Sequence, residues 1–228
     1  DNAVYCFAPG SMNKLWIGTE NGINYYLYKS KQLKTFTVTA DGKKVKYVHS
    51  IHELNDTTLW VSTVGEGIVK IILNKNGITP TVKSTTRIIL DGGRLASNYF
   101  FTSFQENDSI LWFGNRGYGA HRLNLETGKF TPYKFDNIVN SQMTNDIFAI
   151  YKNENGYWFA TSSGLLHFNQ EDSQHHNKVE LLSKNTAHGI LEDQQNNIWI
   201  STNQGLVRFN PKTHTSQTYD RKNGLEVT

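Results

Sequence analysis

The sequence predicts an all-β fold of the β-propeller class, and two observations predict it. The first is a repeat in the sequence: the five Trp residues of this 228-residue chain follow one another at intervals of 44, 52, 46 and 41 residues. Periods of about 40 to 50 residues are typical of propellers and solenoids, which repeat one supersecondary unit. The second is that each interval contains short apolar runs bounded by Gly-containing turns, without helical periodicity. The five residues are Trp16, Trp60, Trp112, Trp158 and Trp199.

The residues around each Trp repeat as well. Every copy has an apolar residue, Trp, an apolar residue, a small residue, and then Thr or Asn. Beyond each Trp, a Gly is followed by an apolar or small residue, as in Gly22-Ile23 and Gly205-Leu206. Five matching copies predict five equivalent structural units. The matching pentapeptides are residues 15–19, 59–63, 111–115, 157–161 and 198–202.

The fourth unit illustrates the four strands that we expect in each blade. Asn155-Gly156 suits a hairpin turn between the first and second strands, and Ser163-Gly164 suits one between the second and third. Helix signals are absent from the unit. The four strands are expected at residues 145–151, 157–161, 165–169 and 179–182.

The Trp strand predicts sheets that are covered on both sides. Alternation along the strand places Trp158 and Ala160 on one face, and Tyr157 and Phe159 on the other. Both faces are apolar, so each must pack against a neighbouring sheet. The small residue two positions after the Trp leaves room for a large side chain of the adjacent sheet. We therefore expect the five Trp side chains to be buried between blades. The expected limits of the five four-stranded blades, in one propeller domain, are about residues 1–40, 41–90, 91–136, 137–184 and 185–222.

Composition and charge exclude several classes of protein. The chain has 23 Lys and Arg against 20 Asp and Glu, and the basic residues are scattered, so nucleic acid is not an expected partner. Cys6 is the one cysteine, which excludes an internal disulfide. No apolar run approaches the roughly 18 to 20 residues that span a bilayer.

The sequence lacks the motifs of the common catalytic and metal sites. It has no Gly-x-Ser-x-Gly elbow, no His-Glu-x-x-His motif, no P-loop and no paired Cys. His49 and His52 are three residues apart on an expected strand, so they point to opposite faces and do not converge on a metal. Asp193 is expected to order a hairpin through hydrogen bonds to the backbone. We therefore expect no catalytic residues, no metal and no cofactor.

The fifth unit carries the fullest version of the repeat and resembles a known family. Residues 191–210 contain an apolar residue and Asp193, then Trp199 between apolar residues, then Gly205 before Leu206. This pattern resembles the two-component-regulator propeller repeat, and the resemblance extends over essentially the whole chain. The third unit departs from it, because Asn115 replaces the Thr.

The resemblance implies a location, partners and a function. It implies the periplasmic sensor region of a hybrid two-component system of the Bacteroidetes type, where two seven-bladed propellers precede a small β-sandwich, a transmembrane helix and kinase modules. Five blades would then be part of a seven-bladed propeller, with residues 223–228 beginning a further blade. The implied partners are an oligosaccharide or other small ligand, the rest of the sensor chain, and a second copy in a homodimer. The chain itself is expected to be non-catalytic.

A ligand-binding surface is expected on the loops that enter each first strand and those that join the second strand to the third, since these loops gather on one face of a propeller. Aromatic rings stack on sugar rings, while Arg and Asn donate to hydroxyl, carboxylate or sulfate groups. His188 is expected in the register of Ile147. The candidate residues are Arg94, Asn98, Arg116, Tyr118, Asn145 and His188.

Two alternative functions stay open at this point. A secreted propeller lyase or hydrolase would need convergent acid and base groups, or a metal, on the binding face. A protein-interaction scaffold would need neither, and no feature of the sequence separates it from a sensor.

Overall fold

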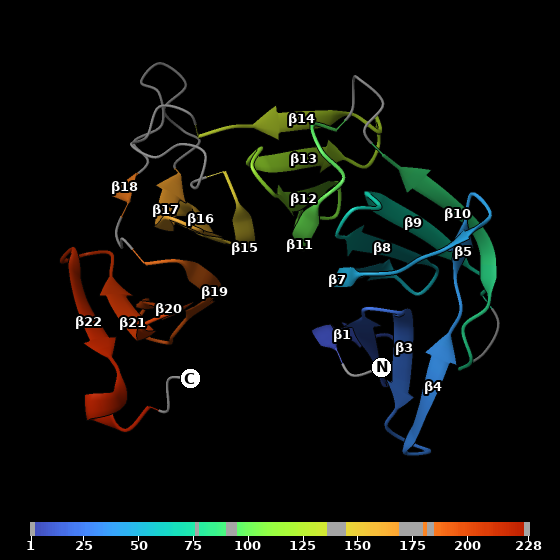
Figure 1. The fold of residues 1–228 in the computed structure, drawn as a ribbon, viewed down its shortest axis with the longest axis horizontal. Coiled ribbons are helices and arrows are strands. Elements are labelled where there is room, and N and C mark those ends of the chain that lie inside the picture. Colours follow the sequence, from blue (N-terminus) through green and yellow to red (C-terminus); the bar gives the residue numbers. More distant parts are fainter. Residues whose placement is uncertain are drawn as a thin grey trace. The chain divides into compact units, whose positions relative to one another are not determined.

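A computed structural model describes residues 3–75, 78–89, 95–135, 145–168, 180–181 and 185–225. These residues form five four-stranded antiparallel sheets and one two-stranded hairpin (Figure 1). Consecutive strands are hydrogen-bonded neighbours in every four-stranded sheet. The helical structure of the described segments is limited to a single 3-10 turn, Arg221–Asn223. The all-β expectation is confirmed.

The chain divides into two compact units. Unit 1 comprises Asp1–Arg116 and His121–Tyr133, and unit 2 comprises Gly117–Ala120 and Lys134–Thr228. The first sheet of unit 1 consists of β1 (Val4–Gly10), β2 (Lys14–Thr19), β3 (Gly22–Leu27) and β4 (Gln32–Phe36), and it is followed by the hairpin β5 (Thr39–Ala40) and β6 (Lys43–Lys44). The second sheet consists of β7 (Val48–Asn55), β8 (Thr58–Thr63), β9 (Ile68–Leu73) and β10 (Val82–Ile88). The third sheet consists of β11 (Phe100–Asn107), β12 (Ile110–Asn115), β13 (Ala120–Asn124) and β14 (Phe130–Tyr133). In unit 2, the fourth sheet consists of β15 (Ile147–Asn153), β16 (Gly156–Thr161), β17 (Gly164–Phe168) and β18 (Glu180–Leu181). The fifth sheet consists of β19 (Ala187–Glu192), β20 (Ile198–Thr202), β21 (Gly205–Asn210) and β22 (Thr215–Tyr219).

Within unit 1, the Trp face of one sheet packs against the next sheet along the chain. Trp16 of β2 belongs to one buried cluster with Leu59 and Val61 of β8. Trp60 of β8 belongs to a second cluster with Phe113 of β12, and the two rings lie 5.8 Å apart. Every residue of β8 and β12 is buried, as expected for a strand whose two faces are both covered.

Unit 2 repeats this packing. Trp158 of β16 shares a buried cluster with Ile198 and Ile200 of β20 and with Phe209 of β21. The Trp158 and Phe209 rings lie 6.0 Å apart in a tilted arrangement. The same sequence pattern therefore produces the same interface between sheets in both units.

The small residue of the repeat is needed because two sheets approach closely there. A Cβ added to Gly18 would lie 2.6 Å from the carbonyl oxygen of Val48 in the next sheet. Ser62, Gly114 and Ala160 hold the same place in the second, third and fourth sheets. A larger side chain at this place would separate the sheets and lose the contacts that bury Trp.

The Thr and Gly of the repeat form one turn. Thr63 Oγ1 donates to the carbonyl oxygen of Gly67 at 2.7 Å, and Thr202 Oγ1 donates to that of Gly205 at 2.9 Å. Gly205 has a φ of 123°, and a Cβ there would lie 2.2 Å from the carbonyl oxygen of Tyr219. Glycine is required for both reasons, which explains its place after every Trp strand.

The indole N–H groups of the buried Trp residues are satisfied by acceptors near the end of a first strand. Trp112 Nε1 donates to Glu106 at 2.7 Å. Trp60 is the exception among the described Trp residues, since its indole nitrogen is buried without a hydrogen-bond partner. Leu54 occupies in β7 the bulge position that Glu106 occupies in β11, so the second sheet lacks the carboxylate acceptor.

Trp199 differs from the other four. Trp16, Trp60, Trp112 and Trp158 are buried, whereas Trp199 is half-buried. Its ring stacks on Tyr219 at 5.5 Å, and the Arg208 guanidinium lies 6.0 Å from the ring.

Trp158→Ala should lower the free energy of unfolding by about 3 to 5 kcal/mol, because it leaves a cavity between two sheets. Trp199→Ala removes the same side chain from a half-exposed place, so it should cost less. Equilibrium denaturation in urea measures both losses. A loss below about 1 kcal/mol for Trp158→Ala would contradict a core role.

Candidate functional site

Each four-stranded sheet carries a bulge near the beginning of its first strand. The bulge contains one residue without a partner on the second strand, and this residue is aromatic or His in all five sheets. Phe, Trp, Tyr and His are a minority of the chain, with 12, 5, 11 and 8 copies in 228 residues, so five such positions are not a matter of composition. We call these five residues the bulge row. They are Tyr5, His49, Phe101, Phe148 and His188.

In unit 1, the bulge row forms a continuous stack. The first strands β1, β7 and β11 lie side by side. The Tyr5 and His49 rings are stacked with centroids 4.1 Å apart and an interplanar angle of 15°. Phe101 contacts His49 edge-on, at 5.9 Å and 63°. Partial burial lowers the pKa of His49 below its usual value, so the ring is neutral at pH 7.

In unit 2, the bulge row forms a pair. Phe148 and His188 lie on the adjacent first strands β15 and β19, with ring centroids 5.6 Å apart. His188 Nε2 is also 2.6 Å from Asn203 Oδ1, which fixes the ring by a hydrogen bond. The sequence-based expectation that His188 occupies the register of Ile147 is wrong. Ala187 has that register, and the bulge places His188 beside Phe148.

Polar side chains continue the contact between β7 and β11 beyond the bulges. Ser50 Oγ and Ser103 Oγ are 2.6 Å apart, and His52 Nε2 is 2.9 Å from Gln105 Oε1. His52 is therefore committed to the neighbouring sheet. No three His, Cys, Asp or Glu residues of the described segments gather closely enough to hold a metal, at His52 or elsewhere.

Two of the six candidate residues from the sequence lie in unit 1 at the edge of the third sheet. The carbonyl oxygen of Asn98 accepts from the backbone N–H groups of Gly65 and Gly67, at 3.0 and 2.9 Å, so its backbone joins two sheets. Arg116 is exposed, and its guanidinium lies 5.9 Å from the ring of Tyr99, which is also exposed. Arg116 and Tyr99 together present a cation and an aromatic face to solvent.

The remaining candidates are not equivalent. Arg94 lies outside the described residues. Tyr118, in unit 2, is exposed, with Lys134 Nζ 5.3 Å from its ring. Asn145 is only 2% exposed, and its Oδ1 accepts from the backbone N–H of Phe135 at 2.8 Å. The Asn145 side chain therefore fixes the backbone at Phe135.

The sequence analysis missed most of the bulge row, although the signal was present. An aromatic residue or His precedes each Trp of the repeat by 11 positions, or by 10 in the fourth sheet. Only His188 was chosen, because the sequence places it at the start of a first strand in the register of Ile147. A bulge is not marked by Gly or Pro here, so its position follows only from comparing the copies.

Glu66, between β8 and β9, has a structural role. Arg87 is buried and donates to Glu66 Oε2 at 2.9 Å and to the carbonyl oxygen of Ala40 at 3.3 Å. This arrangement ties the β5–β6 hairpin to the second sheet. The ion pair with Arg87 leaves Glu66 poorly suited to acid or base chemistry.

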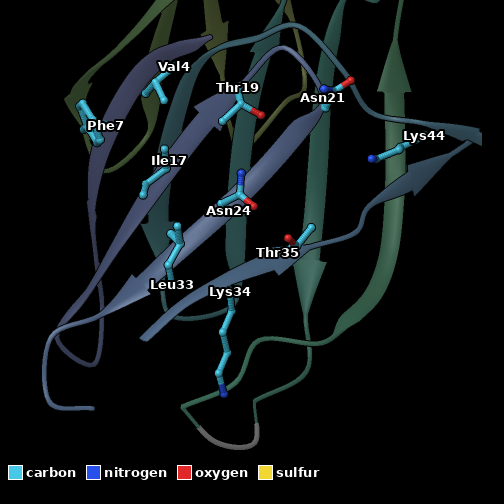
Figure 2. Close-up of a pocket in the computed structure, with 10 residues that line it drawn as sticks. All are labelled: Val4, Phe7, Ile17, Thr19, Asn21, Asn24, Leu33, Lys34, Thr35 and Lys44. Carbon is cyan, nitrogen blue, oxygen red and sulfur yellow. The ribbon is translucent and has the colours of Figure 1, made fainter. Parts of the chain in front are cut away.

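One face of the first sheet carries an open hollow of about 640 Å³, which Figure 2 shows across β1 to β4. Ile17 lies in it at the position that Val61 holds in the second sheet, where Val61 is buried in the cluster of Trp16. The hollow is thus the face that receives a Trp side chain elsewhere in the repeat. Phe7 and Leu33 on this face are 65% and 66% exposed.

Comparison with known proteins decides the type of repeat. The family described as "Two component regulator propeller" matches residues 181–204. The chain contains the two-component regulator propeller repeat. The resemblance seen in the sequence is confirmed.

Similar proteins match most of the chain. Histidine kinase P4 of Formosa agariphila is 28% identical over 173 residues, which are 72% of this chain and 12% of that protein. The extracellular domains of the hybrid two component systems BT3049 and BT4673 from B. thetaiotaomicron have TM-scores of 0.75 and 0.77, each at 20% identity, over 96% and 97% of this chain. They share the fold, which confirms the propeller class. The chain spans 28% and 30% of those solved chains and 12% of the histidine kinase, which is less than a third of each of these three proteins.

In the propeller repeat at residues 181–204, Asp193 organises the hairpin between β19 and β20. Its carboxylate accepts from the Asn197 side chain at 2.9 and 3.1 Å, from the backbone N–H groups of Gln195 and Asn197 at 2.9 Å, and from Trp199 Nε1 at 2.8 Å. The side chains of Asn197 and then Trp199 are the main donors, and they lower the pKa of Asp193 to about 2. The expectation that Asp193 orders this hairpin is confirmed.

No helix of the described residues is long and apolar enough to cross a membrane.

Asp193 should make the stability of the fifth sheet depend on acid pH. Since folding lowers its pKa from 3.8 to about 2, its contribution is complete above pH 3.8 and is lost as the pH falls through about 2. The difference in unfolding free energy between the wild type and Asp193→Asn should therefore shrink over this pH range. Urea denaturation at a series of pH values measures it, and a difference that stays constant to pH 2 would contradict this role.

Proposed function

We propose that this chain is part of the ligand-binding propeller of an extracytoplasmic sensor in a hybrid two-component system. The observation that carries the proposal is that extracellular domains of two such systems match 96% and 97% of the chain, while the family match is to a two-component regulator repeat. The similarity to a histidine kinase supports the same role for the longer protein. The kinase activity would reside outside these 228 residues.

We further propose that the ligand is derived from a carbohydrate and that it is bound without being cleaved. Exposed aromatic rings and an exposed Arg supply stacking and charge-assisted hydrogen bonds, which suit a sugar with an acidic group. Arg116 over Tyr99 is such a pair. Carboxylates close to the predicted loops are already bonded, as Glu66 is to Arg87 and Asp146 to Ser162. A secreted lyase or hydrolase is therefore the weaker alternative, and a protein-interaction scaffold has no specific observation in its favour.

Arg116→Ala should weaken binding of acidic oligosaccharides about tenfold and leave binding of neutral ones unchanged, because it removes one charge-assisted contact. Calorimetry with the 228-residue chain, and with the longer extracytoplasmic region, measures the affinities. Arg208→Ala is the matched control, since this Arg also lies over an aromatic ring but in the outer part of the fifth sheet. Equal losses for acidic and neutral ligands, or release of new sugar ends, would contradict the proposal.

The partners follow from the open hollow of the first sheet. We propose that a further sheet of the longer sensor chain covers it, since the equivalent face of the second sheet packs against a Trp face. A homodimer of the whole sensor stays a proposal that rests on the family resemblance.

The 228-residue chain should self-associate through this hollow when it is expressed alone. Replacing both Phe7 and Leu33 with Ser should shift sedimentation toward the monomer, because it removes the two most exposed apolar side chains of the face. Tyr28→Ser is the control, since Tyr28 is exposed but does not line the hollow. An unchanged association state in the double variant would place the contact elsewhere.

A further inference from the structure

The bulge row occupies a special position between core and solvent. The residue before each bulge belongs to the core in four sheets, as Val48, Phe100, Ile147 and Ala187 are all fully buried. The residue after it is small, as Ser50 is in β7. A bulge turns its side chain away from the regular alternation of the strand. The bulge row therefore projects from the edge of the sheets and not from either packed face.

Burial in the core does not explain why these positions are aromatic. None of the five residues is among the buried core residues of the described chain. Tyr5 is 41% exposed, His188 is exposed, and the other three are partly exposed. Polar residues would be solvated at such positions without the cost of exposing an aromatic ring. An exposed row of rings is instead typical of a contact surface.

The stack in unit 1 has a defined chemical character. Its rings carry no charge at neutral pH, since partial burial lowers the pKa of His49. One face of Tyr5 is covered by His49, and much of the Tyr5 side chain is open to solvent. A flat, uncharged aromatic face suits the apolar side of a sugar ring, whose hydroxyl groups lie at its edge and can stay solvated.

We infer that Tyr5, stacked on His49, which Phe101 in turn contacts edge-on, is the stacking platform for one sugar ring of the ligand. The inference rests on the proposed function and names residues for it that the loops do not contain. Arg116 would serve a different part of the ligand, namely an acidic substituent. The Phe148 and His188 pair presents the same kind of surface in unit 2, independently of the stack in unit 1.

The test uses the histidine rings as reporters of binding. The 228-residue chain, labelled in its His side chains, is titrated with cellobiose and with digalacturonate and followed by NMR. Ring signals of His49 should shift with both sugars because a ring placed on Tyr5 alters the stack. Signals of His214 should stay in place, since that side chain lies in the turn before β22, outside the bulge row.

Variants of Tyr5 separate binding from structure. Tyr5→Ala should weaken sugar binding about tenfold, and Tyr5→Phe should keep it within about twofold, because the ring and not the hydroxyl makes the contact. Tyr28→Ala removes an equally exposed Tyr, 48% against 41%, from the region between β3 and β4 and should change nothing. Thermal denaturation of each variant checks that the fold is retained.

The outcomes distinguish this inference from the function on which it rests. Shifts elsewhere with unchanged His49 signals, or undiminished affinity in Tyr5→Ala, would overturn the platform and leave the carbohydrate sensor standing. Absence of any binding to the neutral and acidic sugars would overturn both. Weaker binding in Tyr5→Ala together with retained binding in Tyr5→Phe would support the platform.

Discussion

The fold depends on one constraint, which is that the Trp strand of each sheet has apolar residues on both faces. The central strands β8 and β12 have no solvated side, so the second and third sheets are stable only when other layers cover them. Each repeat therefore places a large Trp ring on one face of the sheet and a small residue where the next sheet approaches. Gly18, which lies against the backbone of Val48, is such a small residue. Because packing uses both faces, ligand contacts are left to strand ends, loops and edges. The bulge row lies at such an edge.

Polar side chains form hydrogen bonds across the interfaces between sheets, and these bonds fix how one sheet is positioned on the next. Glu53 of β7 accepts from Trp16 Nε1 and from the backbone N–H of Ser11, both in the preceding sheet. Glu192 of β19 does the same in unit 2, accepting from Tyr151 Oη at 2.6 Å and from Asn153 Nδ2 at 2.9 Å. Burial and this carboxylate raise the pKa of Tyr151 to about 12, so the phenol remains a donor. Apolar surfaces alone would tolerate sliding, whereas these bonds fix the register of one sheet on the next.

The sequence was sufficient for features that are local. The Trp spacing, the glycine after each Trp strand and the hairpin role of Asp193 all depend on residues within one repeat, and the structure agrees with them. It was insufficient for features that depend on register or on distant residues. His188 was assigned to the register of Ile147 because a one-residue bulge has no compositional mark, and Asn145 was taken for a surface residue although its side chain caps a buried backbone N–H. The partner of Trp16 is 37 residues away, beyond the reach of periodicity.

The bulge also places a core residue and a residue of the proposed binding surface next to each other in one strand. Val48 and His49 are neighbours in β7, yet the first is fully buried and the second lies in the ring stack. Substitution in the bulge row can therefore alter a binding surface while the core beside it is unchanged. The same strand joins the third sheet through Ser50 and His52. Under the proposed function, a ligand that repositions the ring of His49 would act on the strand whose hydrogen bonds hold two sheets together.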